Sequence, residues 1–254
     1  MDGIDVSYCQ RCFPWGRYDG GFAMIKASQG KSQYGSYAGD FIEDSEYRRN
    51  AAGATAEGVP WGAYHYLTAR NTGEAHAEAA RFCSVLAERR DDMRLWAAVD
   101  VESTRWLPDE KTVLTAVVRE FCAEVACRGF KPMVYSGPSF IGRRFDLPAG
   151  VPLWLALWGK ESAAKRYDPV IWQYGMDQKY GVDGDIGYFT LPGLSETDAG
   201  APVYAVGGQY KIKAGDKYTN GWAVPARLVG RSYEIGKVKE GAVYLPALWS
   251  WVRV

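Results

Sequence analysis

The sequence is poor in the residues that bind metals or form disulfides. Its 254 residues include two histidines, His65 and His76, and five cysteines. An odd number of cysteines does not complete a disulfide framework. Cys9 and Cys12 have C-x-x-C spacing, yet no second pair of Cys or His residues completes a tetrahedral zinc site. We therefore expect reduced thiols, no metal and no cofactor.

Long apolar runs are also lacking. No stretch of about 18 apolar residues is present, so no membrane-spanning helix is predicted. The segment Met1–Asp5 has no basic region, and no apolar stretch of signal-peptide length follows it. The expected place of synthesis is the cytoplasm, so action outside the membrane would require release by another protein.

The net charge is zero, so no global field favours nucleic acid as a partner. The charge is unevenly distributed, because the segment from Ala201 onward has eight basic and three acidic residues, a net charge of +5. The basic residues are Lys211, Lys213, Lys217, Arg227, Arg231, Lys237, Lys239 and Arg253. This asymmetry predicts a separate basic unit whose partner is a polyanionic surface.

Short apolar runs alternate with helical patterns through most of the chain. The expected strands are 3–6, 22–26, 61–66, 95–101, 132–136, 151–158 and 170–174. Apolar residues recur at helical spacing over 109–128, and helices are also expected over 45–56 and 74–90. Alternating strands and helices predict an α/β fold with a mostly parallel sheet. The number of strands fits a TIM-like barrel, which we expect to be irregular because helical patterns are weak after Tyr135.

The composition changes after Leu191, where Pro, Gly and Ser accumulate. Beyond this point, short strand patterns are separated by turn signals such as Gly207-Gly208 and Asn220-Gly221. We therefore predict a barrel over 1–192, a linker over 193–202 and a small all-β domain over 203–254.

Asp100 and Glu102 form the most informative motif. They follow Leu95–Val99, an apolar run that is typical of a buried strand. Side chains two apart on a strand point to the same face, so the two carboxylates are expected side by side. Like charges at that distance push one pKa up and the other down. The resulting acid and anion are what hydrolysis of a glycosidic bond requires, whereas the alternative is a solvated acidic loop.

Polar and aromatic side chains also follow the other expected strands, at the end where barrel enzymes hold their sites. They are Asp5, Lys26, Gln29, Tyr64, His65, Tyr66, Tyr135, Ser136, Trp154, Trp158, Trp172 and Gln173. Asp183 and Asp185 follow in a Gly-rich turn. We expect His65 to be a hydrogen-bonded strand residue and not a metal ligand.

Aromatic residues indicate the substrate class. The chain has ten Trp and seventeen Tyr, and the C–H faces of sugar rings lie flat on such side chains. Trp154, Trp158 and Trp172 are the expected platforms, whereas Trp61 and Trp96 lie early in their strands and are assigned to packing.

Several motifs occur in the order found in one enzyme family. They are Gly3-Ile-Asp-Val-Ser7 with Gln10, Phe22-Ala-Met-Ile-Lys-Ala-Ser-Gln-Gly30, Asp44 with Tyr47 and Asn50, Gly62-Ala-Tyr-His-Tyr66, Val99-Asp-Val-Glu102, Val134-Tyr-Ser136, Leu153-Trp-Leu-Ala156 and Trp172-Gln-Tyr174. Over residues 1–190 the chain resembles the family 25 glycoside hydrolases, the N-acetylmuramidases of phage endolysins and bacterial autolysins. The resemblance implies an irregular β/α barrel that needs no metal. The reaction it implies is cleavage of the β-1,4 bond between N-acetylmuramic acid and N-acetylglucosamine in peptidoglycan.

The resemblance also implies roles for the acids. Glu102 matches the proton donor, and Asp100 and Asp5 match acids that stabilise the cationic centre. The segment Gly181–Gly187 departs from the family pattern at the fourth acid, where we favour Asp185; Asp183 or no acid are the alternatives. The expected substrate-binding residues are Lys26, Gln29, Tyr64, Tyr135, Trp154, Trp158, Trp172 and Gln173. The resemblance favours attack by the N-acetyl group of the substrate, and direct attack by a carboxylate stays open.

The tail, residues 210–251, resembles the SH3-like cell-wall-binding modules that accompany such enzymes. Its expected partners are anionic wall polymers, and the likeness to endolysins implies release through a pore made by another protein. Three other functions stay open. They are a barrel that binds wall glycan without cutting it, a wall amidase or peptidase, and a barrel for some other sugar. An amidase or peptidase would need metal ligands or a Cys/His pair, and the chain has only two histidines.

Overall fold

The computed structural model describes residues 1–30, 41–189, 204, 206–213, 215–219, 223–239 and 242–253. It divides the chain into two compact units, Met1–Ala199 and Gly200–Val254, which are described separately below. The predicted linker, residues 193–202, lies outside the described residues. Within the described residues, no helix has both the length and the apolar character needed to cross a membrane.

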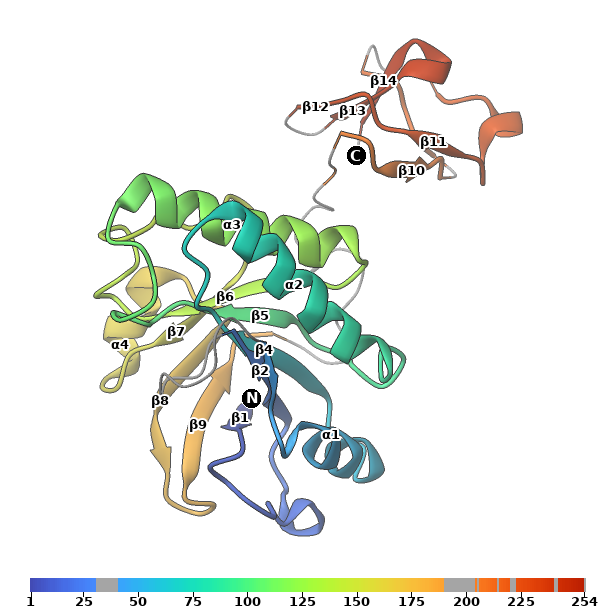
Figure 1. Ribbon diagram of the computed structural model, residues 1–254. Coiled ribbons are helices and arrows are strands. Elements are labelled where there is room, and N and C mark those ends of the chain that lie inside the picture. Colours follow the sequence, from blue (N-terminus) through green and yellow to red (C-terminus); the bar gives the residue numbers. More distant parts are fainter. Residues whose placement is uncertain are drawn as a thin grey trace. The chain divides into compact units, whose positions relative to one another are not determined.

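Eight strands of the first unit close into a barrel (Figure 1). They are β1 (Asp2–Val6), β2 (Phe22–Gln29), β4 (Trp61–Tyr66), β5 (Ala97–Asp100), β6 (Pro132–Ser136), β7 (Leu153–Ala156), β8 (Ile171–Asp177) and β9 (Val182–Gly187). The strands from β1 to β8 pair in parallel in chain order, and β9 lies antiparallel between β8 and β1. A two-residue strand, β3 (Ile42–Glu43), pairs with the end of β2. The predicted irregular α/β barrel is confirmed.

Three helices lie outside the barrel: α1 (Tyr47–Ala56), α2 (Thr72–Ala87) and α3 (Lys111–Cys127). Figure 1 shows α2 and α3 side by side. The start of α2 is a capping box, because Asn71 Oδ1 accepts from Glu74 N and Glu74 Oε2 accepts from Arg70 N. After β6 the connections contain little helix, with only α4 (Glu161–Ala164) and a 3₁₀ turn over Lys165–Tyr167, both between β7 and β8.

The strand β9 corrects one expectation from the sequence. Asp183 and Asp185 were predicted in a turn, whereas they lie two apart on β9 and so face the same side of the sheet. The turn is earlier, at Gly181, whose φ of 66° suits glycine. Gly184 leaves room for Tyr174, since a Cβ there would be 2.3 Å from the tyrosine oxygen. The glycines that suggested a turn therefore shape a strand.

The reversed direction of β9 brings its last residue to the start of β1. The Met1 amino group donates to Gly187 O at 2.9 Å, and Gly187 N donates to Met1 O at 2.8 Å. The same end of the barrel interior is closed by aromatic rings, with Phe189 packed edge-on against both Phe22 and Trp96. Apolar packing therefore fills this end and leaves the polar side chains at the opposite rim.

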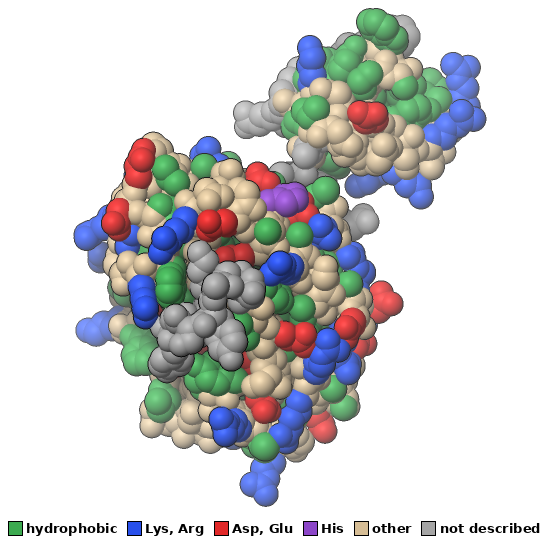
Figure 2. Space-filling view, in the orientation of Figure 1, with side chains coloured by type: hydrophobic (Ala, Val, Ile, Leu, Met, Phe, Trp, Pro, Cys, Tyr) green, Lys and Arg blue, Asp and Glu red, His purple; other side chains and the backbone are tan. Residues whose placement is uncertain are grey.

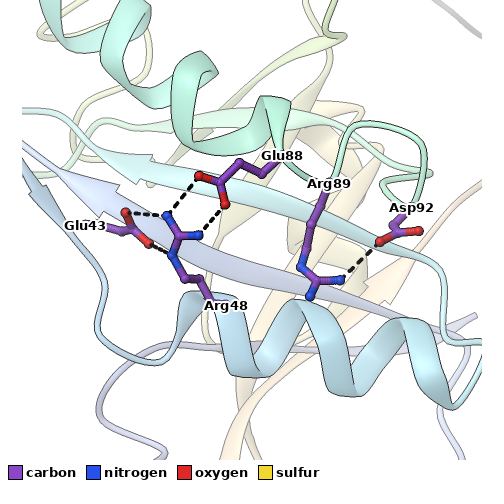
Figure 3. A network of polar contacts seen from close by, with 5 residues as sticks. All are labelled: Glu43, Arg48, Glu88, Arg89 and Asp92. Carbon is purple, nitrogen blue, oxygen red and sulfur yellow. Dashed lines mark hydrogen bonds and ion pairs between the residues drawn. The ribbon is translucent and has the colours of Figure 1, made fainter.

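An exposed ion-pair network joins elements on the outside of the barrel (Figure 3). The Arg48 guanidinium of α1 binds Glu43 of β3, with Nε 2.7 Å from Oε1, and it also binds Glu88 at the end of α2. Arg89 pairs separately with Asp92 at 3.2 Å. All these groups are accessible to water, so their contribution to stability is small.

The second unit is built from short strands around its own core. The strands are β10 (Gln209–Lys211), β11 (Ser232–Glu234), β12 (Lys237–Lys239), β13 (Ala242–Leu245) and β14 (Ser250–Arg253). They form a two-stranded and a three-stranded antiparallel sheet. The core residues include Tyr210, Ile212, Ile235, Val243, Leu245 and Val252. Figure 2 shows Lys and Arg side chains gathered on this unit, in line with the charge predicted from the sequence.

Candidate active site

Asp100 and Glu102 lie at the rim where the parallel strands end. Asp100 is the last residue of β5 and is buried, whereas Glu102 follows the strand and is exposed. Val101 between them packs into the outer core. The period of two therefore continues past the strand end and directs both carboxylates to the inner side, as the sequence predicted.

Asp5 joins these acids from β1. It is buried, and its Oδ2 accepts a hydrogen bond of 2.8 Å from Gln173 Nε2 on β8. Gln173 Oε1 in turn accepts from Tyr135 OH at 3.1 Å and from Trp158 Nε1 at 3.2 Å. One amide thus connects an acid to two aromatic side chains from other strands.

Asp185 lies on the inner face of β9 and is fully buried. Trp154 Nε1, from β7, donates to its Oδ1 at 2.7 Å. Its other oxygen, Oδ2, accepts from no N–H or hydroxyl group among the described residues, and the same is true of Asp100 Oδ1. The Asp185 and Asp5 carboxyl groups hydrogen-bond each other when one of them holds a proton. Buried carboxylate oxygens without a donor are costly, so both are available to a proton or to a charged group of a bound molecule.

Burial dominates the electrostatics of this cluster. It raises the pKa of Asp5 to about 8, with a further contribution from the charge of Asp183. Burial also raises the pKa values of Asp100 and Asp185 well above the ordinary range, helped by Glu102 and Asp5 respectively. The pKa of Glu102 is raised too, first by burial of its surroundings. The expectation that one pKa of the Asp100–Glu102 pair is pushed down is therefore wrong, because desolvation outweighs the mutual effect of the pair.

Lys26 places a positive charge beside the acids. Its Nζ lies 5.5 Å from the ring centre of Tyr8 and 5.4 Å from that of Tyr66, and donates to Gln29 Oε1 at 3.0 Å. This charge lowers the pKa of Asp100 and of Glu102, opposing the effect of burial. The predicted pair of Lys26 and Gln29 is thus brought together at the rim.

The predicted aromatic residues take three different positions. Trp158 is 64% exposed at the rim. Trp154 is inside the barrel at 1% exposure, with Tyr64 and Tyr135 packed edge-on against it. Both tyrosines pack on Trp154, which donates to Asp185, so this group supports the acids and leaves little surface for stacking.

Trp172 does not join the site. It is 6% exposed and packs with Leu153 and Leu155 on the outer side of the sheet, while its Nε1 donates to Leu157 O at 2.7 Å. The neighbouring Gln173 points inward, and alternation along β8 directs Trp172 outward. The assignment of Trp172 as a sugar platform is therefore withdrawn.

His65 lies on the outer face of β4, away from the acids. Its Nδ1 is 2.8 Å from Ser28 Oγ and its Nε2 is 2.9 Å from Glu78 Oε2. The prediction of a hydrogen-bonded strand residue is confirmed. Among the described residues, no group of three or more His, Cys, Asp or Glu side chains could hold a metal ion.

One contributor to the rim, Tyr8, was missed in the sequence, and Asp44, which is among the residues that carry the family resemblance, was given no role there. Tyr8, which contacts Lys26, directly follows the Gly3–Ser7 motif and lies in the loop after β1. Asp44 holds this loop, because its Oδ2 accepts from Tyr8 N at 3.1 Å. A strand-end position was the available signal for Tyr8, whereas the role of Asp44 depends on a contact between distant segments. A hollow on the outer surface is lined partly by Lys111, Arg119 and Asp146. It is separate from the candidate site, because none of Asp5, Asp100, Glu102 and Asp185 lines it.

Comparisons with known proteins were made for the sequence and for the fold. The family described as "Glycosyl hydrolases family 25" matches residues 4–182. The comparison with curated protein sequences gave no match. Among solved structures, the barrel is similar to the modular autolysin LytC from Streptococcus pneumoniae, solved with a synthetic peptidoglycan ligand. The TM-score is 0.63 at 17% identity, over 74% of this chain and 46% of the autolysin chain.

Two further structures are similar at comparable identity. The spore cortex lytic enzyme SleM from Clostridium perfringens has a TM-score of 0.61 at 19% identity, over 100% of this chain and 86% of that one. A bacterial lysozyme from Streptomyces coelicolor has a TM-score of 0.55 at 19% identity, over 76% of this chain and 94% of that one. These likenesses establish the fold, and the chain spans about half the length of the autolysin.

Proposed function

The chain belongs to family 25 of the glycosyl hydrolases, and on this premise we propose that it cleaves the β-1,4 bond between N-acetylmuramic acid and N-acetylglucosamine in peptidoglycan. The observation that carries the proposal is the cluster of three buried carboxyl groups, Asp5, Asp100 and Asp185, beside one exposed carboxyl group, Glu102. The named similar structures support a wall-glycan substrate, since one of them is an autolysin with a peptidoglycan ligand.

Glu102 is the proposed general acid. It is the member of the cluster that is exposed to solvent, so a polymer lying across the rim can reach it. Its raised pKa keeps the proton bound to a higher pH than an ordinary glutamate would. The proton is delivered to the glycosidic oxygen of the leaving sugar as that bond breaks.

Asp5, Asp100 and Asp185 are proposed to stabilise the positive charge that develops on the sugar. In the unbound site, burial favours the neutral forms of these acids. A cationic sugar above them would lower their pKa values, so that protons pass from these acids to water at the open rim and the resulting carboxylates face the positive charge. Stabilisation would then be stronger in the transition state than in the ground state, which is the condition for catalysis.

The remaining residues divide into those that contact substrate and those that hold the acids. Trp158 is the proposed sugar platform, and Lys26 and Gln29 are proposed to bind polar groups of the sugar. Gln173 and Trp154 orient Asp5 and Asp185 through their hydrogen bonds. Tyr64 and Tyr135 pack against Trp154 and are proposed to fix its position.

The test is analysis of the fragments released from purified cell walls by the full chain. A muramidase leaves N-acetylmuramic acid at the new reducing ends, which mass spectrometry identifies. Glu102→Gln is expected to lower the rate by about 10²–10⁴-fold, the usual contribution of a general acid, while wall binding persists. Glu57→Gln, at an exposed glutamate after α1, is the matched control.

Two outcomes would contradict the proposal. Wall binding without any release of reducing ends would identify a glycan-binding barrel without activity. Release of free peptides or of N-acetylglucosamine reducing ends would identify an amidase or a glucosaminidase instead.

For the second unit, we propose an SH3-like module that binds anionic wall polymers. The supporting feature is one face of the sheet β12–β13–β14, where Lys237 pairs with Tyr244 and Tyr244 pairs with Trp251. The rings of Tyr244 and Trp251 are 5.5 Å apart, and Trp249 nearby in sequence is 85% exposed. Aromatic rings beside cations suit a sugar polymer that carries negative charge.

The wall-binding proposal is tested in the full chain. The double variant Lys237→Ala, Trp249→Ala is expected to weaken sedimentation with intact walls while leaving cleavage of soluble glycan fragments unchanged. An equal effect on both measurements would mean that the second unit has only a structural role.

A further inference from the structure

Three side chains in the loops after β4 and β5 have no part in the reaction described above. Trp106 lies in the loop from β5 to α3 and is half-buried. The Arg105 guanidinium lies 4.6 Å from the centre of the Trp106 ring. The Arg70 guanidinium, from the loop after β4, lies 5.9 Å from the same ring. Loops after two adjacent strands thus bring two positive charges to one indole.

The position of Trp106 is tied to the acids through a chain of contacts. Trp106 N donates to the buried Ser103 Oγ at 3.2 Å, and Ser103 also hydrogen-bonds the Tyr66 side chain. The Tyr66 ring is in turn 5.4 Å from Lys26 Nζ. Cations and aromatic rings therefore continue along the rim from Lys26, beside the acids, to Trp106.

Arg70 is held by its backbone, and its side chain stays at the surface. Its N–H donates to Glu74 Oε2 at 2.8 Å, as part of the capping box of α2. The side chains of Arg70 and Arg105 are both exposed. Two guanidinium groups at one half-buried ring give this part of the surface both a ring face and N–H donors, and this combination suits a ligand that joins a flat or apolar part to a carboxylate.

The chemistry of the substrate indicates what that ligand is. In the wall glycan the lactyl carboxyl group of each muramic acid residue is amide-bonded to its peptide, so the negative charge of a substituted strand lies on the carboxylates of the peptides. A sugar ring or peptide stem can lie on Trp106 while arginine binds carboxylates through its fork of N–H donors. We propose that Arg70, Trp106 and Arg105 form a subsite for the carboxylate-bearing stem peptide of peptidoglycan, beside the bond that Glu102 cleaves. This inference rests on the proposed function.

The test measures binding and not turnover. The full chain carrying Glu102→Gln is titrated with a soluble tetrasaccharide of the wall that keeps its stem peptides, and with the same tetrasaccharide stripped of peptides and with its lactyl carboxyl groups converted to amides, so that the second ligand carries no carboxylate. The parent is expected to bind the peptide-bearing form more tightly. Arg70→Ala with Arg105→Ala is expected to weaken that binding about fivefold, as for the loss of two exposed ion pairs, and to leave the peptide-free form unchanged.

Further variants separate charge from stacking. Trp106→Ala is expected to weaken the binding of both ligands, and Arg70→Glu is expected to abolish the preference for the peptide-bearing form. Higher salt should reduce that preference in the parent. Arg81→Ala, at an exposed arginine further along α2, is the matched control and should change neither affinity.

Several outcomes would overturn the inference. Equal losses on both ligands, or no loss on either in the double arginine variant, would mean that the arginines only pack on Trp106. A loss seen with poly(glycerol phosphate) but not with the peptide-bearing ligand would assign the subsite to another wall anion. Failure of the proposed function would be seen in another measurement, because walls treated with the unmutated chain would then release no reducing ends.

Discussion

Buried carboxyl groups lie on both faces of the barrel wall, one on the outer face and three on the inner face. On the outer face, Glu78 of α2 accepts hydrogen bonds from Thr68 N at 3.1 Å and Thr68 Oγ1 at 2.8 Å, and it also binds His65. Burial alone would raise the pKa of Glu78, but these hydrogen bonds hold it below its ordinary value. On the inner face, burial raises the pKa of Asp5, Asp100 and Asp185.

The difference between the two faces is the supply of donors. Glu78 has a donor for each oxygen, whereas Asp100 Oδ1 and Asp185 Oδ2 have none among the described residues. The carboxyl groups of both faces are buried, so burial alone does not decide whether a pKa is raised or lowered. A buried carboxylate that accepts hydrogen bonds stabilises the fold. A buried carboxylate without donors lowers the stability of the fold, and such groups are retained where they serve a function.

Removing the outer carboxylate is expected to have the largest effect on stability. Glu78→Ala would leave His65 and the Thr68 hydroxyl buried without their partner, and we expect a loss of about 3 kcal/mol. The measurement is the urea transition of the barrel at pH 7. Glu57→Ala, at an exposed site, should change it by less than about 0.5 kcal/mol. If both variants behaved alike, the comparison between the two faces would fail.

Removing an ionisable group from the inner face is expected to increase the stability of the barrel, opposite to the effect of Glu78→Ala. Because the pKa of Asp185 in the fold lies above its ordinary value of 3.8, the contribution of this group to stability is fully present below that value and is lost as the pH rises. Asp185→Asn keeps an acceptor for Trp154 and removes the ionisable group. We expect a gain of about 1 kcal/mol at pH 8 that vanishes near pH 4, with lower hydrolytic activity.

Thermal unfolding at both pH values checks this sign. Asp91→Asn, at an exposed aspartate, is the control and should show no such pH dependence. A loss of stability in Asp185→Asn at pH 8 would show that Asp185 is ionised and well solvated in the fold, contrary to its burial.

The effect of Lys26 on the pKa of Glu102 can be tested separately from the effect of burial. Its charge lowers the pKa of Glu102, so Lys26→Met should raise that pKa. The general acid must be protonated, and activity falls as the pH passes its pKa, so the alkaline limb of the pH–rate profile should move to higher pH. Soluble glycan fragments are the substrate, and Lys160→Met is the control. An unmoved alkaline limb would mean that Glu102 is not the group seen in the profile.

The exposed network of Figure 3 should have the smallest effect. Arg48→Ala removes the contacts with Glu43 and Glu88, both of which lie in water-accessible positions. We expect only a slight change in the stability of the barrel, diminishing further at high salt, because solvent screens these exposed charges. A loss as large as that of Glu78→Ala would contradict the view that burial with donors is what makes an ion pair matter here.

Parts of this arrangement could be predicted from sequence because they depend on local period. Asp100 and Glu102 follow a strongly apolar run, so their shared direction follows from strand alternation. Trp172 shows where this reasoning fails. A barrel strand is buried on both faces, and so the sequence of β8 does not tell the inner side from the outer. The inward side depends on Gln173, whose partners come from three other strands.

The acids of β9 were difficult for a different reason. Gly181 and Gly184 are usual turn residues, yet Gly184 is required by the approach of Tyr174, a contact within a folded hairpin. The raised pKa values were equally hidden, because desolvation depends on everything that surrounds a group. A pair of acids in sequence indicates mutual repulsion but gives no measure of burial.

The reversal of the last barrel strand has a practical consequence for building new proteins. Because β9 ends at Gly187 beside Met1, both the entry and the exit of the barrel chain are at the end closed by Phe22, Trp96 and Phe189. Attachments made at either place begin on the side away from the carboxyl groups. We therefore expect a protein fused at residue 1 or after residue 189 to leave the strand ends that hold Asp5 and Asp100 accessible.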